Sequence, residues 1–298
     1  MNNQDILQLT EKGRHSSIAP LLHTSKFAIM KGKFQSPFRR MSFTPADMNE
    51  LEVVTEDIVE ANLNSYLQYW DVDNRKVDLS AWKLVKSKDQ LRVYSERRWR
   101  ARYSPEDNSS SGNADLQSLL CVGATPGSLA DVMLGLTSPT LEATRASASY
   151  VEYLSGAAVL STVKEPTGGD PFKSTAVKWM ELDVRRRSMG FVKNRDYVYV
   201  EATGIKHLPS GERLGYHIMH SVDIPQAHDL SGRVRAKLST CSFFRQRGKD
   251  CVRLRFGNNG PDERQDSSAC GAMLHQNSTH DTRTRSFRGN EKAVTSSR

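Results

Sequence analysis

The chain has 298 residues, of which 37% are hydrophobic and 26% are charged, and its formal net charge is +8. Residues 1–44 hold seven Lys or Arg and two Asp or Glu, whereas residues 45–256 hold 29 and 27. Because the basic excess lies mostly in an N-terminal tail, we expect no nucleic-acid binding by the central region. The four cysteines form no C-x-x-C pair, which excludes a zinc-finger framework.

Both ends of the chain have the composition of tails. Residues 1–44 are basic and only weakly periodic, and residues 257–298 are rich in Asn, Ser, Thr, Asp and Gly, so we expect both to be disordered. The first residues lack the apolar core of a signal peptide, and no run approaches the roughly 18 apolar residues of a membrane span. We therefore expect a soluble, cytoplasmic protein.

The central region, residues 45–256, predicts an α+β protein with one strongly curved antiparallel sheet. Thr44, Pro45 and Asp47 form a start signal for an amphipathic helix that ends near Trp70. A shorter helix is expected over 128–136. Runs of β-branched and aromatic residues predict the strands. These runs are 82–85, 91–97, 116–123, 157–163, 176–184, 197–203, 213–222, 235–246 and 251–256.

A basic loop joins two strand-like segments, WMELDV (179–184) and DYVYV (196–200). Arginines attract anionic lipid head groups, and exposed Met and Phe side chains can enter a membrane interface. The loop is therefore a candidate membrane-contact rim around an apolar pocket. Its candidate contact residues are Arg185, Arg186, Arg187, Met189 and Phe191. The alternative is a solvated hairpin whose Met and Phe fold back onto the core.

The segments KNRDYVYV (193–200), HSVDIP (220–225) and GRVRAK (232–237), in this order, resemble the START lipid-transfer domains over about residues 45–256. The resemblance implies a helix-grip fold, in which a U-shaped sheet holds a long C-terminal helix and one lipid or sterol lies between them. It also implies transient contact with a membrane surface, so that the protein would be peripheral to membranes.

The resemblance implies a set of pocket residues. An acidic residue on the strand before the NRD loop matches Glu181, and the side chains after Asp196 alternate, which turns Val198 and Val200 to the opposite face. The expected ligand-binding residues are Trp179, Glu181, Tyr197, Tyr199, Glu201, His217, Met219 and Leu238.

Two departures from the family pattern stand out. The closing helix should follow the last strand, yet the sequence after Phe256 has no apolar face, so the helix is supplied otherwise or the chain is an incomplete or altered gene product. Position 201 is a glutamate where some sterol-binding members carry a basic residue, so the ligand class stays open.

Catalytic and metal sites are weakly supported by the sequence. His217 and His220 lie three apart on a strand and face opposite sides, and no nucleotide or nucleophile motif occurs. Glu181 and Glu201 could form an acid/base pair, or could accept hydrogen bonds from a ligand hydroxyl or pair with an arginine. We expect non-catalytic binding, and intermembrane transfer, of a single lipid or sterol, with no cofactor and no metal. The alternatives are a regulatory module that has lost lipid carriage and an aromatic-cyclase-type enzyme on the same fold.

Overall fold

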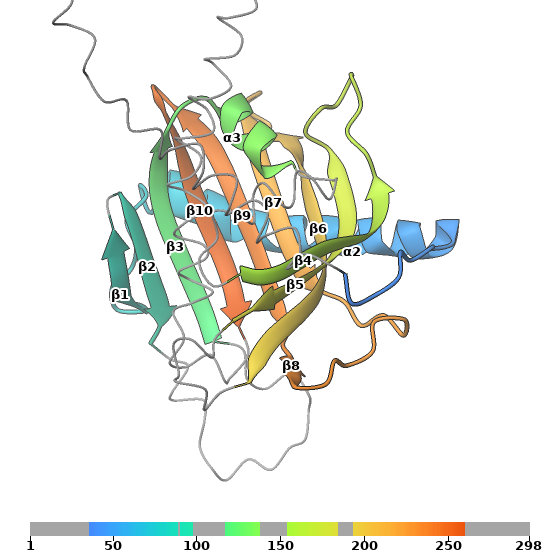
Figure 1. Cartoon of the computed structure of the whole chain (residues 1–298). Coiled ribbons are helices and arrows are strands. Elements are labelled where there is room, and N and C mark those ends of the chain that lie inside the picture. Colours follow the sequence, from blue (N-terminus) through green and yellow to red (C-terminus); the bar gives the residue numbers. More distant parts are fainter. Residues whose placement is uncertain (1–35, 89, 98–116, 138–153, 184–192, 260–298) are drawn as a thin grey trace, which may run out of the picture.

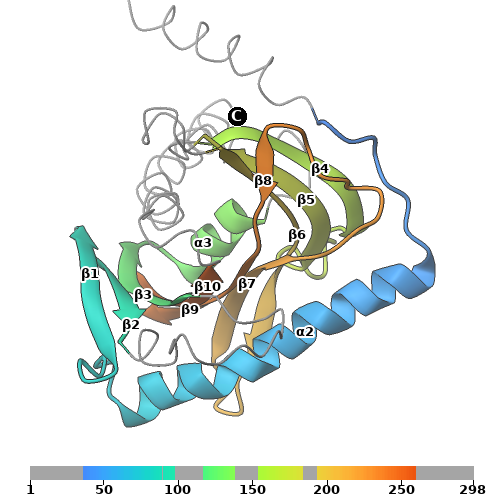
Figure 2. The same cartoon turned by 90° about the horizontal axis from the view of Figure 1, so that it is seen from below.

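The computed structural model describes residues 36–88, 90–97, 117–137, 154–183 and 193–259 (Figure 1). Its strands form one sheet in the order β1-β2-β3-β10-β9-β7-β6-β5-β4, and β8 pairs with β6. The strands are β1 (Trp82–Lys88), β2 (Leu91–Glu96), β3 (Gln117–Pro126), β4 (Leu154–Lys164), β5 (Ser174–Leu182), β6 (Asn194–His207), β7 (Arg213–Ser221), β8 (Arg233–Arg235), β9 (Leu238–Arg247) and β10 (Asp250–Asn259). Apart from the parallel pair of β6 and β8, all pairings are antiparallel, and the sheet curls at its β4–β5 end (Figure 2). The predicted α+β class is confirmed.

The long helix α2 (Pro45–Leu67) lies across the convex face of the sheet (Figure 2). Its predicted start is confirmed by a capping box: Thr44 Oγ1 accepts a hydrogen bond from the Asp47 amide at 3.2 Å, and Asp47 Oδ2 accepts one from the Thr44 amide at 2.9 Å. The helix then widens into a π-helical turn, η1 (Gln68–Val72), which ends close to the predicted boundary at Trp70.

Aromatic packing attaches α2 to the sheet. The fully buried Tyr66 ring lies 5.0 Å from the Phe243 ring on β9 and stacks on Trp70 at 5.9 Å. The guanidinium of Arg245 lies 4.7 Å from the centroid of the Trp70 ring, a cation–π geometry. Each large apolar side chain buried in this way contributes about 2 kcal/mol from its removal from water, so α2 is an integral part of the core.

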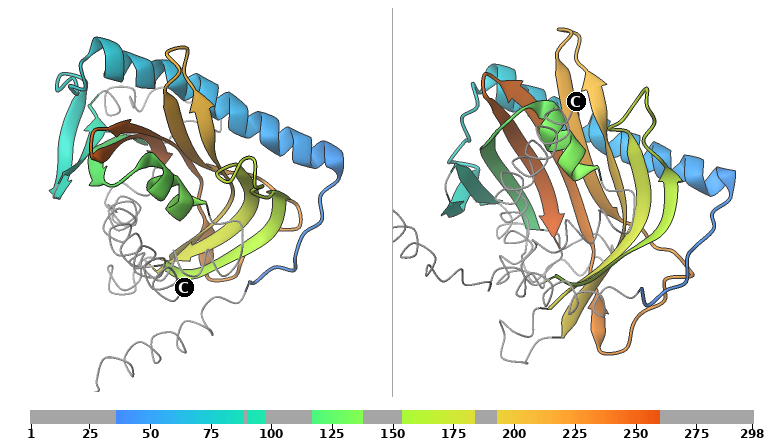
Figure 3. Two further views of the ribbon diagram at one scale, coloured as in Figure 1. Left: turned by 90° about the horizontal axis from the view of Figure 1, so that it is seen from above. Right: turned by 45° about the horizontal axis from the view of Figure 1, so that its top comes forward.

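The short helix α3 (Leu129–Leu136) lies inside the curve of the sheet, on the face opposite to α2 (Figure 3). Ser128 caps it, and the helix lies within the range 128–136 that the sequence predicts. A Cβ atom at Gly215 of β7 would lie 2.5 Å from the Met133 sulfur, so a larger residue there would force the buried Met133 side chain to shift. Because α3 fills the concave side at one end only, the remainder of that face is where a candidate site must be sought.

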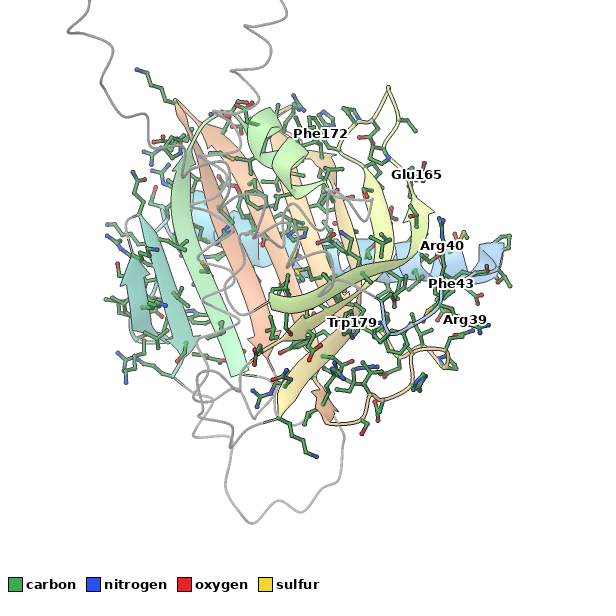
Figure 4. The ribbon with its side chains drawn as sticks, in the orientation of Figure 1. Arg39, Arg40, Phe43, Glu165, Phe172 and Trp179 are labelled. Atoms are coloured by element: carbon green, nitrogen blue, oxygen red, sulfur yellow. The ribbon has the colours of Figure 1, made fainter. Side chains whose placement is uncertain are left out.

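The folded unit begins earlier in the chain than residue 45. Phe38 and Met41, which the sequence assigns to a tail, are each 7% exposed and join a cluster with Trp179 and Val198. The Met41 amide donates a 2.8 Å hydrogen bond to the Leu160 carbonyl of β4. Residues 36–44 therefore run along the outer side of β4 and β5, where Figure 4 labels Arg39, Arg40 and Phe43. At the other end, β10 continues three residues past the predicted boundary, to Asn259. The remaining parts of both tails lie outside the described residues.

Candidate functional site

The strand β6 divides its side chains between the two faces of the sheet. Tyr197 and Tyr199 pack with Met219 on the concave face, whereas Val198 packs with Trp179 on the convex face. The strand period of two thus places Glu201 with the two tyrosines on the concave side. Cross-strand pairing of Glu201 with Met219 and of Thr203 with His217 extends the same face onto β7.

The concave face carries an apolar cluster at each end. One cluster gathers Leu182, Tyr197, Tyr199, Met219 and Leu238, with Leu154, Met180 and Ala236 around it. The other gathers the buried side of α3 with Phe244 and Cys251, and Ile205 packs against it. Along β6, β7 and β9 the residues between these clusters are polar, so a polar band crosses the concave face between two apolar ends. The band consists of Lys178, Glu201, Thr203, His217, Thr240 and Ser242.

An ionic cluster lies at the centre of the polar band. Lys178 Nζ forms an ion pair with Glu201 Oε2, and His217 Nε2 lies 3.0 Å from Glu201 Oε1. The Lys178 and His217 side chains are each 2% exposed, so both charges and hydrogen bonds are shielded from water. Burial alone would raise the pKa of Glu201, but the positive charge of Lys178 and the hydrogen bond of His217 lower this pKa to about 2. Glu201 is therefore ionised throughout the physiological range.

Two hydroxyl groups of the band have contrasting environments. Thr203 Oγ1 donates a 2.8 Å hydrogen bond to the Phe172 carbonyl. Thr240 Oγ1 is buried and has no hydrogen-bond partner among the described residues. Nearby, burial and then the negative charge of Glu201 raise the pKa of Tyr199 well above its usual value, so its phenol stays a neutral donor. The band therefore offers a carboxylate and an unsatisfied hydroxyl, and the neutral phenol of Tyr199 lies beside it on the same face.

Two of the expected ligand-binding residues, Trp179 and Glu181, lie on the face of the sheet opposite to Glu201. Trp179 is on the convex side, where its indole Nε1 donates to Asp196 Oδ2 at 3.1 Å. Glu181 lies two residues after Trp179 in the same strand, so its side chain is on the same convex face. It forms an ion pair with Arg233 Nε at 2.9 Å, and Asn194 donates a hydrogen bond to its Oε1 at 3.0 Å. The pairing register of β5 with β6 determines the face of Trp179, because cross-strand partners point to the same face and Trp179 pairs with Val198. Trp179 and Glu181 therefore do not line the surface that Glu201 lines.

The residue that sequence reasoning missed is Lys178. It lies between Val177 and Trp179 in an otherwise apolar strand, and this interruption is the signal that could have identified it. Its side chain meets Glu201 across the strand pair, so Lys178, rather than Glu181, is the charged residue that β5 contributes to the concave face.

The sequence also predicts a membrane-contact rim, two histidines on opposite faces, and no metal site or membrane span. The candidate rim residues, Arg185 to Phe191, lie outside the described residues. His217 and His220 face opposite sides, since His220 Nδ1 lies 2.9 Å from Ser239 Oγ, away from the ionic cluster. In the part of the chain that the structure describes, no group of three or more His, Cys, Asp or Glu could hold a metal ion. Within the same residues, no helix is long and apolar enough to cross a membrane.

A groove of about 430 Å³ lies on the convex side, between the end of α2, the turn after η1 and the strands β1 and β3. Tyr69, Trp82 and Leu120 form its apolar wall, and Asp73, Lys76 and Asp78 are among its polar residues. It does not include any of the residues of the polar band, which lie on the other face of the sheet.

Neither a protein-family model nor a curated protein sequence matches the chain. The structure is nevertheless similar to that of human StAR-related lipid transfer protein 5, with a TM-score of 0.50 and 14% identity over 78% of this chain and 98% of that one. The chain has a START-like fold. Structures of human STARD10 and of a STAR-related lipid transfer protein from Xanthomonas axonopodis are similar at TM-scores of 0.43 and 0.45, with 12% and 13% identity. These two matches cover 74% and 67% of this chain, and 75% and 99% of the respective relatives.

The START-like fold confirms the sequence resemblance and the predicted helix-grip class as far as the sheet and its N-terminal helix are concerned. The closing helix that the resemblance implies would follow β10, in residues outside the described part. At this level of identity the likeness is one of fold, so the function has to be argued from the concave face itself.

Proposed function

We propose that this chain binds one amphipathic lipid or sterol on the concave face of its sheet, without catalysing a reaction. The observation that carries this proposal is the order of side chains on that face: an apolar cluster, a polar band and a second apolar cluster. A ligand with an apolar body and one polar group matches this order, because apolar walls supply affinity and a few polar groups fix orientation.

The polar band would hold the polar group of the ligand. Glu201 can accept a hydrogen bond from a ligand hydroxyl on lone pairs not used by Lys178 and His217, and Thr240 has an unsatisfied hydroxyl to offer. Satisfying a buried polar atom that has no partner is favourable, since such an atom has lost its hydration without compensation. A hydroxyl or a comparable polar group is therefore the expected contact.

An acid/base mechanism receives no support from the carboxylates considered. Glu181 and Glu201 lie on opposite faces of the sheet, so they cannot flank one bond of one substrate. Glu201 is also held ionised by its neighbours, which suits an acceptor of hydrogen bonds and not a general acid. This supports a binding function over a catalytic one.

Transfer between membranes would require contact with a lipid surface, and we assign that role to the basic loop of Arg185, Arg186, Arg187, Met189 and Phe191. The assignment rests on the sequence of the loop. Replacing both Met189 and Phe191 by Ser is expected to reduce sedimentation of the full chain with vesicles that contain phosphatidylserine. Unchanged sedimentation would exclude this loop as the contact.

Native mass spectrometry of the full chain, followed by extraction and identification of whatever co-purifies, tests the proposal. One lipid or sterol bound per chain is expected. If the protein has a clean apo mass and takes up nothing from mixed vesicles of phospholipid and cholesterol, lipid binding is wrong.

A clean apo mass would instead favour a regulatory module that keeps the fold and carries no lipid. One observation favours this alternative: Lys178, Glu201 and His217 satisfy one another, so the centre of the band needs no ligand to balance its charge. The two functions predict opposite results in the same measurement.

A further inference from the structure

Arg253 on β10 is a buried cation to which the described residues offer no anion. Its residue is 4% exposed. The Nη2 atom lies 3.6 Å from the Cys121 sulfur, and the Nε atom has no hydrogen-bond partner in the described part of the chain. Within the described ranges, no carboxylate forms an ion pair with Arg253, whereas Arg235 and Arg245 pair with Asp196 and Glu212. Arg245 is buried and Arg235 is partly buried, and each has a carboxylate partner, as guanidinium groups away from water usually do. Arg253 differs from both.

The surroundings of Arg253 do not compensate for the burial of its positive charge. A thiol is a weak hydrogen-bond acceptor, and burial of a charge without a counter-ion costs far more than a hydrogen bond to sulfur returns. Among the described residues, no negatively charged group balances the guanidinium of Arg253.

Arg253 lies on the concave face. It pairs across the sheet with Phe244 on β9 and with Gly123 on β3, and Phe244 belongs to the cluster around α3 on that side. The neighbouring Cys121 shares the face, packed with Leu91 and Val93. Glu201 already pairs with Lys178, so it does not balance Arg253. The described side chains thus leave positive charge on this end of the concave face.

We infer that Arg253 binds the oxyanion, phosphate or carboxylate, of an acidic amphipathic lipid. This inference rests on the proposed lipid-binding function and narrows the ligand class. A guanidinium presents its donors in a planar fork that matches two oxygens of a phosphate or carboxylate. The thiol of Cys121 is then a neighbour that the ligand oxygen replaces as the main contact. A neutral sterol would leave Arg253 without a counter-ion.

The test compares lipids that differ only in the anion. The full chain is incubated with vesicles of a neutral carrier lipid that contain phosphatidic acid or diacylglycerol with the same acyl chains, and uptake is measured by native mass spectrometry. We expect at least about tenfold preference for phosphatidic acid, because a charge-assisted contact in a buried site is lost with diacylglycerol. Oleate against oleyl alcohol makes the same comparison for a carboxylate.

Substitutions at Arg253 distinguish its own contribution to the lipid preference from a general effect of the positive charge of the protein. Arg253→Met is expected to abolish the preference while diacylglycerol uptake persists, and to raise the midpoint of thermal unfolding of the lipid-free protein, because the unpaired charge is gone. Arg253→Lys should keep part of the preference, since lysine retains charge but not the fork. If Arg253→Met does not fold, the Lys variant carries the test alone. The matched control is Arg92→Met. Arg92 is exposed, and its cross-strand partner Val122 lies on the convex side, so this variant should change neither the preference for phosphatidic acid nor the unfolding midpoint.

Each outcome has one reading. Equal uptake of the acidic and neutral lipids by the unaltered protein overturns the inference and leaves the proposed lipid binding intact. An unchanged preference in the Met variant has the same meaning, and if only the Lys variant folds, an unchanged preference in that variant does. Uptake of neither lipid contradicts the proposed function itself. Inorganic phosphate that raises the unfolding midpoint as much as phosphatidic acid, and competes with it, would show that the site takes free phosphate and not a lipid head group.

Discussion

Asp196 on β6 and Arg235 on β8 form the ion pair that joins two sequence motifs. Arg235 donates to Asp196 Oδ2 through Nη2 at 2.8 Å and through Nε at 3.1 Å. Arg235 also donates to the carbonyls of Ala227 and His228, so it closes the loop before β8 onto the sheet. The NRD and VRA segments, which carry the sequence resemblance, therefore meet on the convex side and have a structural role there.

Removing the charge of Asp196 should destabilise the fold. Asp196 is fully buried, and Asp196→Asn would leave Arg235 without its counter-ion. We expect a loss of about 3 kcal/mol in the free energy of unfolding, measured by urea denaturation. Asp223→Asn is the control, because Asp223 and its partner Lys237 are exposed, and it should change stability by less than about 0.5 kcal/mol. Equal effects of the two variants would contradict the structural role of Asp196.

The ionised state of Glu201 makes stability depend on pH in the acid range. Its pKa of about 2 in the folded protein lies below the value of about 4.3 expected in an unfolded chain. The carboxylate therefore stabilises the fold fully above about pH 4.3, and this contribution, about 3 kcal/mol, is lost as the pH falls toward about 2.

The measurement compares the protein with Glu201→Gln by urea denaturation at several pH values. The stability difference between them should shrink as the pH falls through this window. Glu165→Gln, at an exposed position, is the matched control. A difference that stays constant with pH would show that the Glu201 pKa is not lowered.

Removing the hydroxyl of Thr240 tests whether the polar band contacts a ligand, and it should not disturb the fold. Because Thr240 Oγ1 is buried and bonds no other described residue, Thr240→Val removes no hydrogen bond that the structure describes. Stability should stay within about 1 kcal/mol, and the affinity for a bound lipid should fall about fivefold if the ligand uses this hydroxyl. The control is Thr55→Val on α2, where the hydroxyl bonds the Glu52 carbonyl on the far side of the sheet. Native mass spectrometry with the co-purifying lipid measures both, and an unchanged affinity for Thr240→Val removes this residue from the site.

The N-terminal segment should contribute to stability through Phe38. Its ring lies 6.4 Å from the Trp179 ring and 5.5 Å from the His228 ring, both edge-on. Phe38→Ala should lower the free energy of unfolding by about 3 kcal/mol. The neighbouring Arg39 is exposed, so Arg39→Ala should cost less than about 0.5 kcal/mol. If the two variants unfold alike, residues 36–43 are not part of the folded unit.

Local signals explain which parts of the fold were predictable from sequence. The capping boxes at Thr44 and Ser128 are properties of a few adjacent residues, and they located both helices. Alternation and turn residues located the strands. By contrast, the segment around Phe38 has no period, and it is buried only because β4, β5 and the loop before β8 lie beside it in space.

The candidate site was predicted only in part for a related reason. Alternation within β6 grouped Tyr197, Tyr199 and Glu201 correctly on one face, because that requires one strand alone. Assigning a face to β5 requires the register between β5 and β6, which the sequence of either strand does not reveal. The structure pairs Lys178 with Tyr199 and Trp179 with Val198, so the lysine, and not Glu181, reaches Glu201.

The order of strands leaves the sheet with two ends, β1 and β4. At β4, the Met41 amide uses one of the carbonyls that would otherwise recruit a strand from another chain. At β1, the pairing shifts between Leu84 and Lys86, and Lys83, Lys86 and Lys88 add charge along the strand. Irregular pairing and lysines on an edge strand both oppose sheet-to-sheet association. The curved sheet is thereby protected against aggregation at both borders, and shortening the N-terminal segment past Met41 would expose one of them.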